Sequence, residues 1–232
     1  MKLGILKTDD VRKDLVDDFG EYPEMFTRLI HQVDPSIEIS EYDVLRSKYP
    51  HDIDDVGAYL ITGSKASVYD DEDWIRQLGD FVQELHQRRK KLIGICFGHQ
   101  LVAHVLGGRT EKSSAGWLIG VHRHELKQQG LALTGLLEGF DVICSHQDQV
   151  TVPANESITL AGSEKCPIAA CKIQDHILTI QGHPEFTPEY AQRLFSLRRD
   201  QLGDNTINKG IESLNTPVDN PQIARWILHF IQ

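Results

Sequence analysis

The sequence predicts an α/β fold, in which a mostly parallel central sheet is flanked by helices and carries an antiparallel annex. Short apolar runs alternate with segments of helical period, which is the pattern of a sheet covered by helices on both faces. Of the 232 residues, 40% are hydrophobic and 18 are glycine, which is an ordinary globular composition. This length can bury a large core without disulfides or metals, so we expect one domain, 1–232, that needs no cofactor to fold.

The amino-terminal half alternates strands with helices. Four strands are expected, at residues 2–6, 37–42, 57–62 and 92–95. Three helices are expected between and after them, at residues 23–33, around the apolar stripe of Ile75, Leu78, Val82 and Leu85, and at residues 98–106. Strands that alternate with helices in this way indicate a parallel sheet.

The pattern of predicted elements changes after about residue 109. Five strands follow in close succession, at residues 116–126, 141–144, 157–161, 168–173 and 177–181. Part of this stretch is predicted to form the antiparallel annex to the sheet. Thr187-Pro188 and Asn220-Pro221 each combine an N-cap residue with a first-turn proline, so two helices are expected to finish the chain.

Composition excludes several classes of function. The chain has 24 Lys and Arg against 34 Asp and Glu, a formal charge of −10, which disfavours a nucleic-acid partner. Its four cysteines lack the paired spacing of a structural zinc site, and His122 and His124 have no third ligand nearby, so no metal is assigned. With no bilayer-length apolar run, no signal peptide and no phosphate-binding glycine motif, we expect a cytoplasmic chain without membrane partner or nucleotide cofactor.

A nucleophile elbow is indicated by Gly94-Ile95-Cys96-Phe97-Gly98, placed where a buried strand turns into a helix. Glycine is needed on both sides because the strained nucleophile position brings its neighbours close to adjacent backbone. The helix amino terminus beneath the sulfur favours the thiolate of Cys96 over the thiol. The alternative, a cysteine buried at a strand end, would account for the cysteine but not for the two glycines.

A thiolate nucleophile requires a base, and the base requires a group that orients it. His183 and Glu185 lie two residues apart after the strand at 177–181, so they project to the same side of an extended segment. Glu185 is therefore expected to accept a hydrogen bond from His183 while the other ring nitrogen faces Cys96. Taken alone, His-Pro-Glu is typical of a surface turn, and its significance here comes from the elbow.

These motifs resemble the class I (triad) glutamine amidotransferases, which have a flavodoxin-like fold. The resemblance rests on Gly94 to Gln100 together with Gly182 to Glu185, and it implies a Cys96, His183 and Glu185 triad that releases ammonia from glutamine. Thr62-Gly63-Ser64, Ser67 to Asp70 and Ser145 to Val150 are similar to the stand-alone relatives of the GMP synthase amidotransferase domain, including γ-glutamyl peptidases. GMP synthase would have Gly-Gly-Pro in place of Thr62-Gly63-Ser64, and this sequence has no ATP-pyrophosphatase domain to consume ammonia, so GMP synthesis by this polypeptide alone is not expected.

Further roles follow from the mechanism and the resemblance. Backbone N–H groups of Phe97 and Gly63 are expected to receive the negative charge on the carbonyl oxygen, as an oxyanion hole. The resemblance implies that four residues contact bound substrate, namely Gln100, Ser145, His146 and Gln147. The alternatives are an ordinary turn glycine at 63, a plain first-turn helix residue at 100 and a polar strand end at 145–148. His99 is interpreted as structural.

Three functions are consistent with these residues. The first is a glutaminase that converts glutamine to glutamate and ammonia through a Cys96 thioester, feeding a synthase partner that accepts the ammonia. The second is a free-standing γ-glutamyl peptidase that acts on γ-glutamyl peptides or conjugates. The third is a catalytically silent regulatory binding module, which is disfavoured because nucleophile, base and orienting carboxylate are all present.

Overall fold

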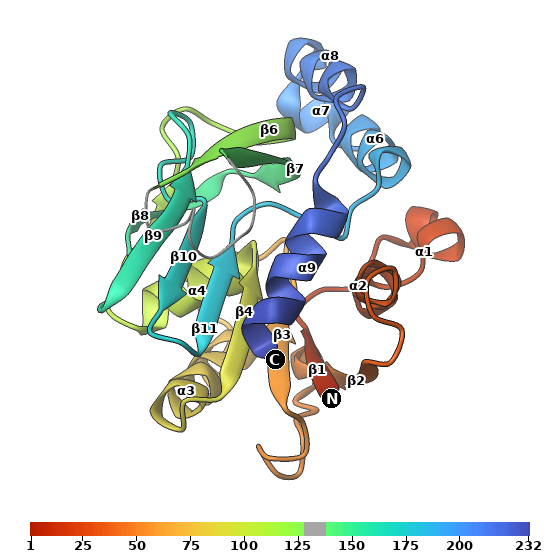
Figure 1. Cartoon of the computed structure of the whole chain (residues 1–232). Coiled ribbons are helices and arrows are strands. Elements are labelled where there is room, and N and C mark those ends of the chain that lie inside the picture. The colour runs from red at the N-terminus through yellow and green to blue at the C-terminus, as the bar shows by residue number, and fades with distance from the viewer. Residues whose placement is uncertain (128–137) are drawn as a thin grey trace.

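A twisted sheet forms the centre of the fold (Figure 1), in a computed structural model that describes residues 1–127 and 138–232. Within the described residues the sheet has nine strands, in the spatial order β2-β1-β3-β4-β11-β10-β9-β6-β7. In that order the strands are Glu38–Asp43, Lys2–Lys7, Ala58–Ile61, Lys91–Ile95, Ile177–Ile180, Ala170–Ile173, Ser157–Gly162, Leu118–Leu126 and Gly139–His146.

The sheet divides into a parallel block and an antiparallel block. β2, β1, β3, β4 and β11 pair in parallel, whereas β10, β9, β6 and β7 continue the sheet by antiparallel pairing. The predicted parallel sheet with an antiparallel annex is therefore confirmed. Because Ile180 pairs with Ile95, the segments that follow β11 and β4 leave the same edge of the sheet side by side.

A small second sheet was not predicted. It pairs β5 (Arg109–Lys112) with β8 (Asp148–Val152) in antiparallel register. In β5 only Thr110 is buried, so this strand lacks the apolar pattern that reveals a strand in a sequence. The pairing places Asp148 beside Lys112, next to the residues expected to hold substrate.

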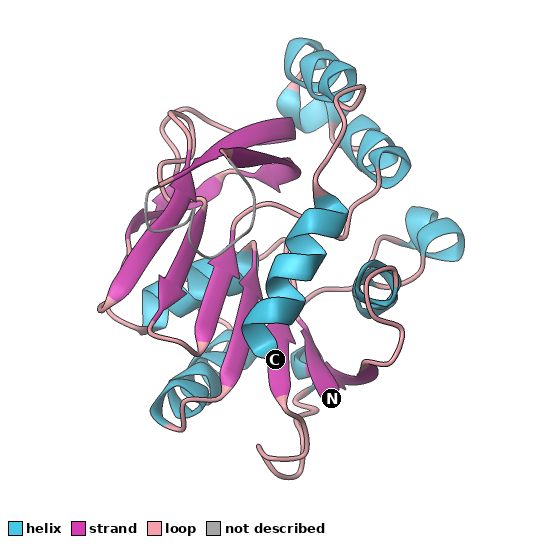
Figure 2. Cartoon of the chain, in the orientation of Figure 1, coloured by secondary structure: helices cyan, strands magenta, loops and turns pink. Residues whose placement is uncertain are grey.

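Helices cover both faces of the sheet, as Figure 2 shows. α2 (Tyr22–His31) and α9 (Asn220–Ile231) pack on one face, where Phe26, Ile30, Ile223 and Ile227 join the strand side chains in one apolar cluster. α3 (Asp73–Gln87) and α4 (Phe97–Val105) pack on the other, where Ile75, Leu78, Val82, Leu85, Phe97 and Leu101 join a second cluster. The one stripe named from the sequence, Ile75, Leu78, Val82 and Leu85 on α3, is buried as predicted.

The carboxyl-terminal region contains more helices than expected. Four are described after β11, rather than two: α6 (Pro188–Ser196), α7 (Arg199–Leu202), α8 (Asp204–Ser213) and α9. α8 was missed because its N-cap residue, Gly203, has no side chain that could cap the helix, and the helix buries only Ile207 and Gly210. The short α1 (Lys13–Phe19) was missed for a similar reason, since Leu15 alone is buried.

The two predicted helix starts differ in outcome. The Thr187 side chain accepts a hydrogen bond from the N–H of Tyr190 and caps α6, as expected. Asn220 is not the N-cap of α9, because Asp219 occupies that position and Asn220 is the first helical residue. The Asn220 amide instead donates to the carbonyl of Phe186, 2.9 Å away, and ties α9 to the segment after Glu185.

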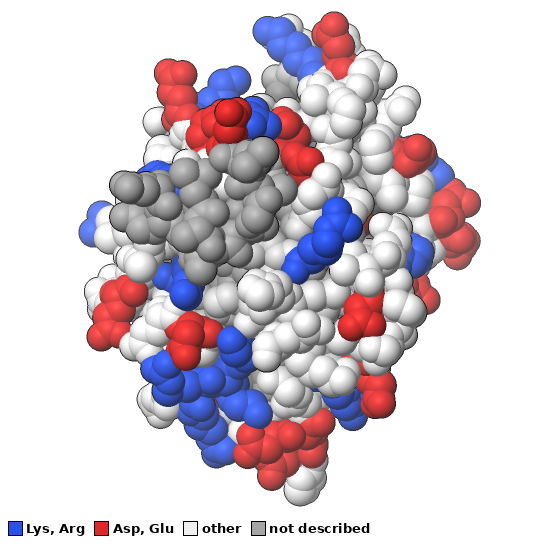
Figure 3. All heavy atoms as spheres, in the orientation of Figure 1, with Lys and Arg blue, Asp and Glu red and all other residues white. Residues whose placement is uncertain are grey.

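The surface mixes charges of both signs. Figure 3 shows basic and acidic side chains next to one another on one face, and ion pairs such as Lys90 with Asp54 at 2.7 Å occur on the surface. Among the described helices, none has the length and apolar character that a bilayer crossing requires.

Candidate active site

Cys96 sits at a sharp bend between β4 and α4. Its backbone has φ 49° and ψ −98°, in the left-handed half of φ space that non-glycine residues rarely adopt. The bend is held on one side by the Cys96 N–H, which donates to the carbonyl of Ile180 at 2.9 Å, and on the other by the Cys96 carbonyl, which accepts from the N–H of Gln100 at 3.0 Å. Cys96 is therefore the residue before the first turn of α4. It lies at the carboxyl edge of the parallel strands, where α/β folds place ligands.

The two glycines of the elbow are required by close contacts. A Cβ on Gly94 would lie 2.7 Å from the carbonyl carbon of Gly98, and a Cβ on Gly98 would lie 2.8 Å from both the Cβ and the carbonyl oxygen of Ile61. Neither backbone position can move away as a flexible side chain would. These contacts therefore explain why glycine is needed at both positions.

His183 and Glu185 lie together on the segment that follows β11. The Nδ1 atom of His183 is 2.8 Å from Oε1 of Glu185, and both side chains are buried. The backbone N–H of His183 donates to the carbonyl of Ile143 on β7 at 2.8 Å, and the Phe186 ring stacks on the imidazole with centroids 4.1 Å apart. The imidazole is consequently fixed in orientation by a carboxylate, a backbone bond and an aromatic ring.

Cys96 and His183 face each other across Gly63. A Cβ placed on Gly63 would lie 2.7 Å from Cε1 of His183 and 3.5 Å from Cβ of Cys96. Burial alone would lower the pKa of His183, but the charges of Cys96 and Glu185 and hydrogen bonds to both raise that pKa to about 10. The imidazole therefore favours its protonated form beside the sulfur.

The loop that carries Gly63 is held by residues that follow β1. The Thr8 hydroxyl donates to the Gly63 carbonyl at 2.8 Å, and the Thr8 N–H donates to the hydroxyl of Thr62 at 3.1 Å. Asp9 accepts hydrogen bonds from the N–H and the ammonium of Lys65, at 3.0 and 2.6 Å. Sequence reasoning did not identify Thr8 or Asp9, although their place after a parallel strand, at the edge that carries ligands, was an available signal.

A cavity of about 430 Å³ opens above the thiol. All four residues expected to contact substrate line this cavity together with Cys96, namely Gln100, Ser145, His146 and Gln147. Ser145 and His146 are the last residues of β7, and Gln147 connects that strand to β8. Ser145 and His146 therefore lie at a strand end, as the alternative interpretation of the sequence states. They also line the cavity, so the two interpretations are compatible.

Contacts within the cavity wall fix these side chains. The Gln100 amide donates to the carbonyl of Asp148 at 2.8 Å and to Oε1 of Gln181 at 3.2 Å. Nδ1 of His146 is 3.0 Å from the same Asp148 carbonyl, while its buried Nε2 has no hydrogen-bond partner in the described part of the chain. Burial lowers the pKa of His146 to about 3, so this imidazole is neutral.

Arg198 is the main wall residue that the sequence analysis missed. Its guanidinium donates to the hydroxyl of Ser145 at 2.7 Å and lies over the ring of Trp117, 5.1 Å from the centroid. Asp9 and Asp148 are already engaged, by Lys65 and by the Ser67 hydroxyl at 2.6 Å. Arg198 thus brings positive charge to a cavity whose nearby carboxylates have other partners, although it stands just after α6, where the sequence carried no functional signal.

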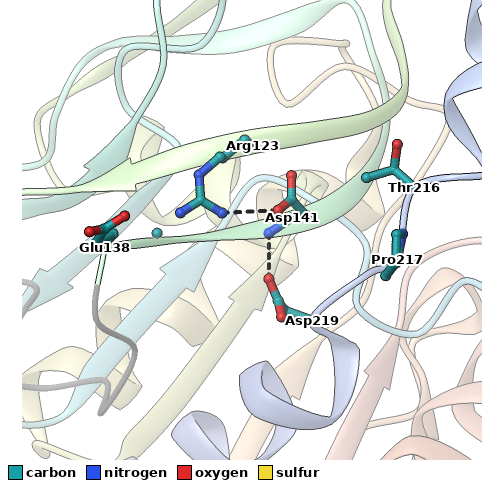
Figure 4. A pocket seen from close by; sticks show the side chains of 7 residues that line it. Arg123, Glu138, Asp141, Thr216, Pro217 and Asp219 are labelled. Atoms are coloured by element: carbon teal, nitrogen blue, oxygen red, sulfur yellow. Dashed lines mark hydrogen bonds and ion pairs between the residues drawn. The ribbon is translucent and has the colours of Figure 1, made fainter.

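Figure 4 shows another hollow, between β6, β7 and the start of α9. There Arg123 pairs with Asp141 at 3.0 Å, and Asp219 accepts the backbone N–H of Asp141 at 2.8 Å. None of the residues expected to act in catalysis or substrate binding lines it. We therefore assign the candidate active site to the cavity above Cys96.

Three histidines discussed in the sequence analysis, His99, His122 and His124, have structural contacts. His99 is buried, with Nδ1 2.8 Å from the Thr179 hydroxyl and Nε2 3.1 Å from the Ile168 carbonyl, which agrees with its structural interpretation. His122 and His124 face the Ile119 carbonyl and the Cys144 sulfur, at 3.1 and 3.7 Å. Within 1–127 and 138–232, no three His, Cys, Asp or Glu residues group as metal ligands.

Comparisons with known proteins identify the family of this chain. The family model "Glutamine amidotransferase class-I" matches residues 15–197. γ-Glutamyl peptidase 3 of Arabidopsis thaliana is 33% identical over 156 residues, which cover 64% of this chain and 63% of the peptidase. GMP synthase (glutamine-hydrolyzing) of Aeropyrum pernix is 32% identical over 215 residues, which cover 91% of this chain and 38% of the synthase.

A solved structure shares the fold. The glutamine amido transferase of Methylobacillus flagellatus superposes with a TM-score of 0.77 at 20% identity, over 99% of this chain and 91% of that one. Its likeness supports the arrangement of sheet and helices described above. Because the family model matches well over half of the residues, the chain belongs to the class-I glutamine amidotransferase family.

Proposed function

We propose that this protein hydrolyses a γ-glutamyl amide bond through a thioester on Cys96. One observation carries the proposal: the sulfur stands at a strained bend on the cavity floor, opposite an imidazole that Glu185 orients and whose pKa is raised. A thiolate beside an imidazolium combines a nucleophile with a proton donor. Glutamine, or a γ-glutamyl peptide, is the substrate.

The chemical steps use these groups in order. The Cys96 thiolate attacks the γ-carboxamide carbon, and a C–S bond forms while the carbonyl π electrons move to oxygen. Collapse of this adduct breaks the C–N bond, and the His183 imidazolium gives its proton to the leaving nitrogen. The neutral imidazole then takes a proton from water, whose oxygen attacks the thioester. Glutamate leaves, the sulfur departs as thiolate, and His183 is again protonated.

Two backbone groups are suited to the developing oxyanion. The N–H of Phe97 is at the first turn of α4, where helix N–H groups have no intrahelical partner. Gly63 approaches both Cys96 and His183 closely, and the Thr8 hydroxyl fixes its carbonyl. A single donor of this kind lowers the barrier by about 3 kcal/mol in enzymes where it has been removed.

The cavity wall supplies groups for the α-amino and α-carboxylate ends of a glutamyl unit. The last residues of β7 and Gln147 provide backbone and side-chain atoms for these ends, and Gln100 lines the same cavity. These roles rest on the family resemblance and on the shared cavity.

The peptidase candidate is favoured by the extent of the cavity. It also reaches Trp117 and Arg198, so its volume can hold a substrate larger than glutamine. γ-Glutamyl peptidase 3 carries that activity in its name, whereas GMP synthase, another relative, is a glutamine-hydrolysing synthase. If glutamine is the substrate, a partner synthase would accept the ammonia.

Turnover of purified protein tests the proposal. We expect release of glutamate from glutamine or γ-glutamyl dipeptides, and none from a Cys96→Ala variant. Hydrolysis of dipeptides without any partner would identify a peptidase; glutamine hydrolysis that appears only after a synthase is added would identify an amidotransferase subunit. No hydrolysis of either substrate under both conditions would favour a silent binding module.

Covalent labelling supplies an independent test. Cys96 and Cys171 are 5% and 6% exposed, so accessibility alone does not separate them. Burial raises the pKa of Cys171 to about 11 and that of Cys166 to about 12, which keeps both thiols protonated at neutral pH. A thiol-alkylating glutamine analogue should therefore give one adduct, on Cys96, and equal labelling of Cys171 would contradict an activated nucleophile.

A further inference from the structure

Arg198 places a guanidinium in the wall of the cavity above Cys96, and the catalytic steps derived above do not use it. The residue lies between α6 and α7, is partly buried, and lines the cavity together with Cys96 and Ser145. Its Nη1 atom donates to the Ser145 hydroxyl at 2.7 Å, and the guanidinium lies over the Trp117 ring, 5.1 Å from the centroid. These two contacts hold the group in place on the wall.

Two of the three guanidinium nitrogens of Arg198 have no hydrogen bond within residues 1–127 and 138–232. These are Nε and Nη2, since Nη1 donates to Ser145, and no carboxylate in that part of the chain forms an ion pair with the side chain. Neither nitrogen is among the buried polar atoms there that lack a partner, so both reach solvent. Because Arg198 lines the cavity above Cys96, a ligand in that cavity can accept hydrogen bonds from them.

The positive charge of Arg198 has no counter-ion in the described cavity wall. Asp9, Asp10 and Asp148 also line the cavity, but each is already bound by another side chain. Burial lowers the pKa of Arg198, whereas the charge of Cys96 raises it, so the guanidinium is partly withdrawn from water and lies within electrostatic reach of the sulfur. A cation in such a place is stabilised by an anion that binds beside it.

The spacing between the thiol and Ser145 suits a glutamyl unit. His183 faces the thiol, and its backbone N–H donates to the Ile143 carbonyl at 2.8 Å. Ser145 stands two residues further along β7, about 7 Å away by the rise of a strand. In an extended glutamyl unit four C–C bonds place the α-carboxylate carbon about 5 Å from the γ-carbonyl carbon. A γ-carbonyl at the sulfur therefore brings the α-carboxylate close to Ser145 and to the guanidinium bonded to it.

We propose that Arg198 binds the α-carboxylate of the glutamyl unit directly, so that the cavity selects γ-glutamyl compounds in which this carboxylate is free. The proposal rests on the proposed function and names a specificity residue for it. A guanidinium presents its N–H donors in a planar fork that matches a carboxylate. Arg198 lies one position beyond residues 15–197, which the family model matches, so this role does not follow from the family match.

Binding is measured by calorimetry on the full chain with Cys96→Ala, which removes the nucleophile. The ligands are L-glutamine and L-glutaminamide, which differ only in a carboxylate or a carboxamide at the α-carbon, together with the same pair as γ-ethylamides. We expect the carboxylate to bind at least tenfold more tightly than the carboxamide. Adding Arg198→Met should reduce this preference to less than threefold, whereas adding Arg199→Met, outside the cavity, should leave it unchanged. None of these ligands carries a carboxylate on its leaving group, so the preference reports the α-carboxylate alone.

Several outcomes would overturn the assignment. An unchanged preference in Arg198→Met, or an equal weakening of both ligands, would show that Arg198 only supports Ser145. Equal binding of carboxylate and carboxamide by the chain that keeps Arg198, or no saturable binding of any of the four ligands, would do so without relying on the folding of Arg198→Met. Calorimetry needs no turnover, so a failure of the proposed hydrolysis is detected separately, as absence of glutamate release by the wild type.

Discussion

Substitution of Gly63 by alanine should impair turnover far more than folding. The added Cβ would lie 2.7 Å from Cε1 of His183, whereas carbon atoms pack at about 3.5–4.0 Å, so the imidazole or the loop must move by roughly 1 Å. Gly63 has no positive φ, so alanine suits its backbone. The buried ring is held by Glu185 and Phe186, which leaves it little room to move.

The size of the effect follows from two contributions. A misplacement of about 1 Å at a reacting group costs on the order of 100-fold in rate. Loss or misdirection of one oxyanion donor costs about 10²–10³-fold in kcat. Because both arise from one displacement, we expect kcat to fall at least about 100-fold with KM within a few-fold. Overpacking should lower the free energy of unfolding by about 1–3 kcal/mol.

The assay compares kcat, KM and urea unfolding for Gly63→Ala and for Gly57→Ala. Gly57 is exposed just before β3, the same strand that Gly63 follows, and a Cβ there would lie 3.2 Å from the flexible Met1 side chain. This control should retain both turnover and stability. A Gly63→Ala enzyme with kcat within threefold of the wild type would refute the assigned role of this loop.

Three further predictions concern the cavity wall, the imidazole and the loop support. Arg198→Met should lower kcat/KM about tenfold for glutamine and for a γ-glutamyl dipeptide alike, because Arg198 donates to Ser145, which is proposed to hold the glutamyl unit that both substrates share; Arg199→Met is the matched control, and an unchanged kcat/KM on both substrates would contradict this role. The pKa of His183 is raised from 6.5 to about 10, so its contribution to stability is complete below pH 6.5 and is lost as pH rises through 10. Urea titrations should therefore show that the difference in unfolding free energy between wild type and His183→Asn shrinks as pH rises from 6.5 to 10. A difference that widens with pH would contradict a raised pKa of His183. Thr8→Val should lower the unfolding free energy by about 1 kcal/mol, because the Gly63 carbonyl loses its donor at 2.8 Å and keeps only the Thr62 hydroxyl at 3.3 Å, and should lower kcat less than Gly63→Ala does; unchanged denaturation would show that the loop needs no such support.

Local patterns in the sequence were sufficient for the elbow and for the His183 and Glu185 pair. A Cβ on Gly94 would meet Gly98 within the bend itself, and two residues spaced by one on an extended segment share a side. The alternating runs likewise predicted the parallel strands and the buried stripe of α3. In these cases the required information lies within about ten residues of chain, whereas the need for glycine at position 98 arises from its contact with Ile61 on β3.

Other features depend on contacts between distant segments. Arg198 reaches Ser145 from 53 positions away, and Thr8 supports Gly63 from 55 positions away, so neither has a local signature. The Ile180 and Ile95 pairing that brings His183 to Cys96 is equally non-local, and the motif order only implied it. α8 was missed because its N-cap residue is a glycine with no capping side chain and its buried face is small.

The position of Arg198 separates specificity from reactivity in the architecture. The bend that presents the sulfur belongs to the sheet and α4, whereas Arg198 belongs to the α6–α7 connection, which contributes no strand to the sheet. Insertions, deletions or grafts in that connection are expected to reshape the cavity wall beside Ser145 without disturbing the backbone around the thiol. We therefore expect that swapping this connection between members of the family changes substrate preference and leaves the reactivity of the thiol unchanged.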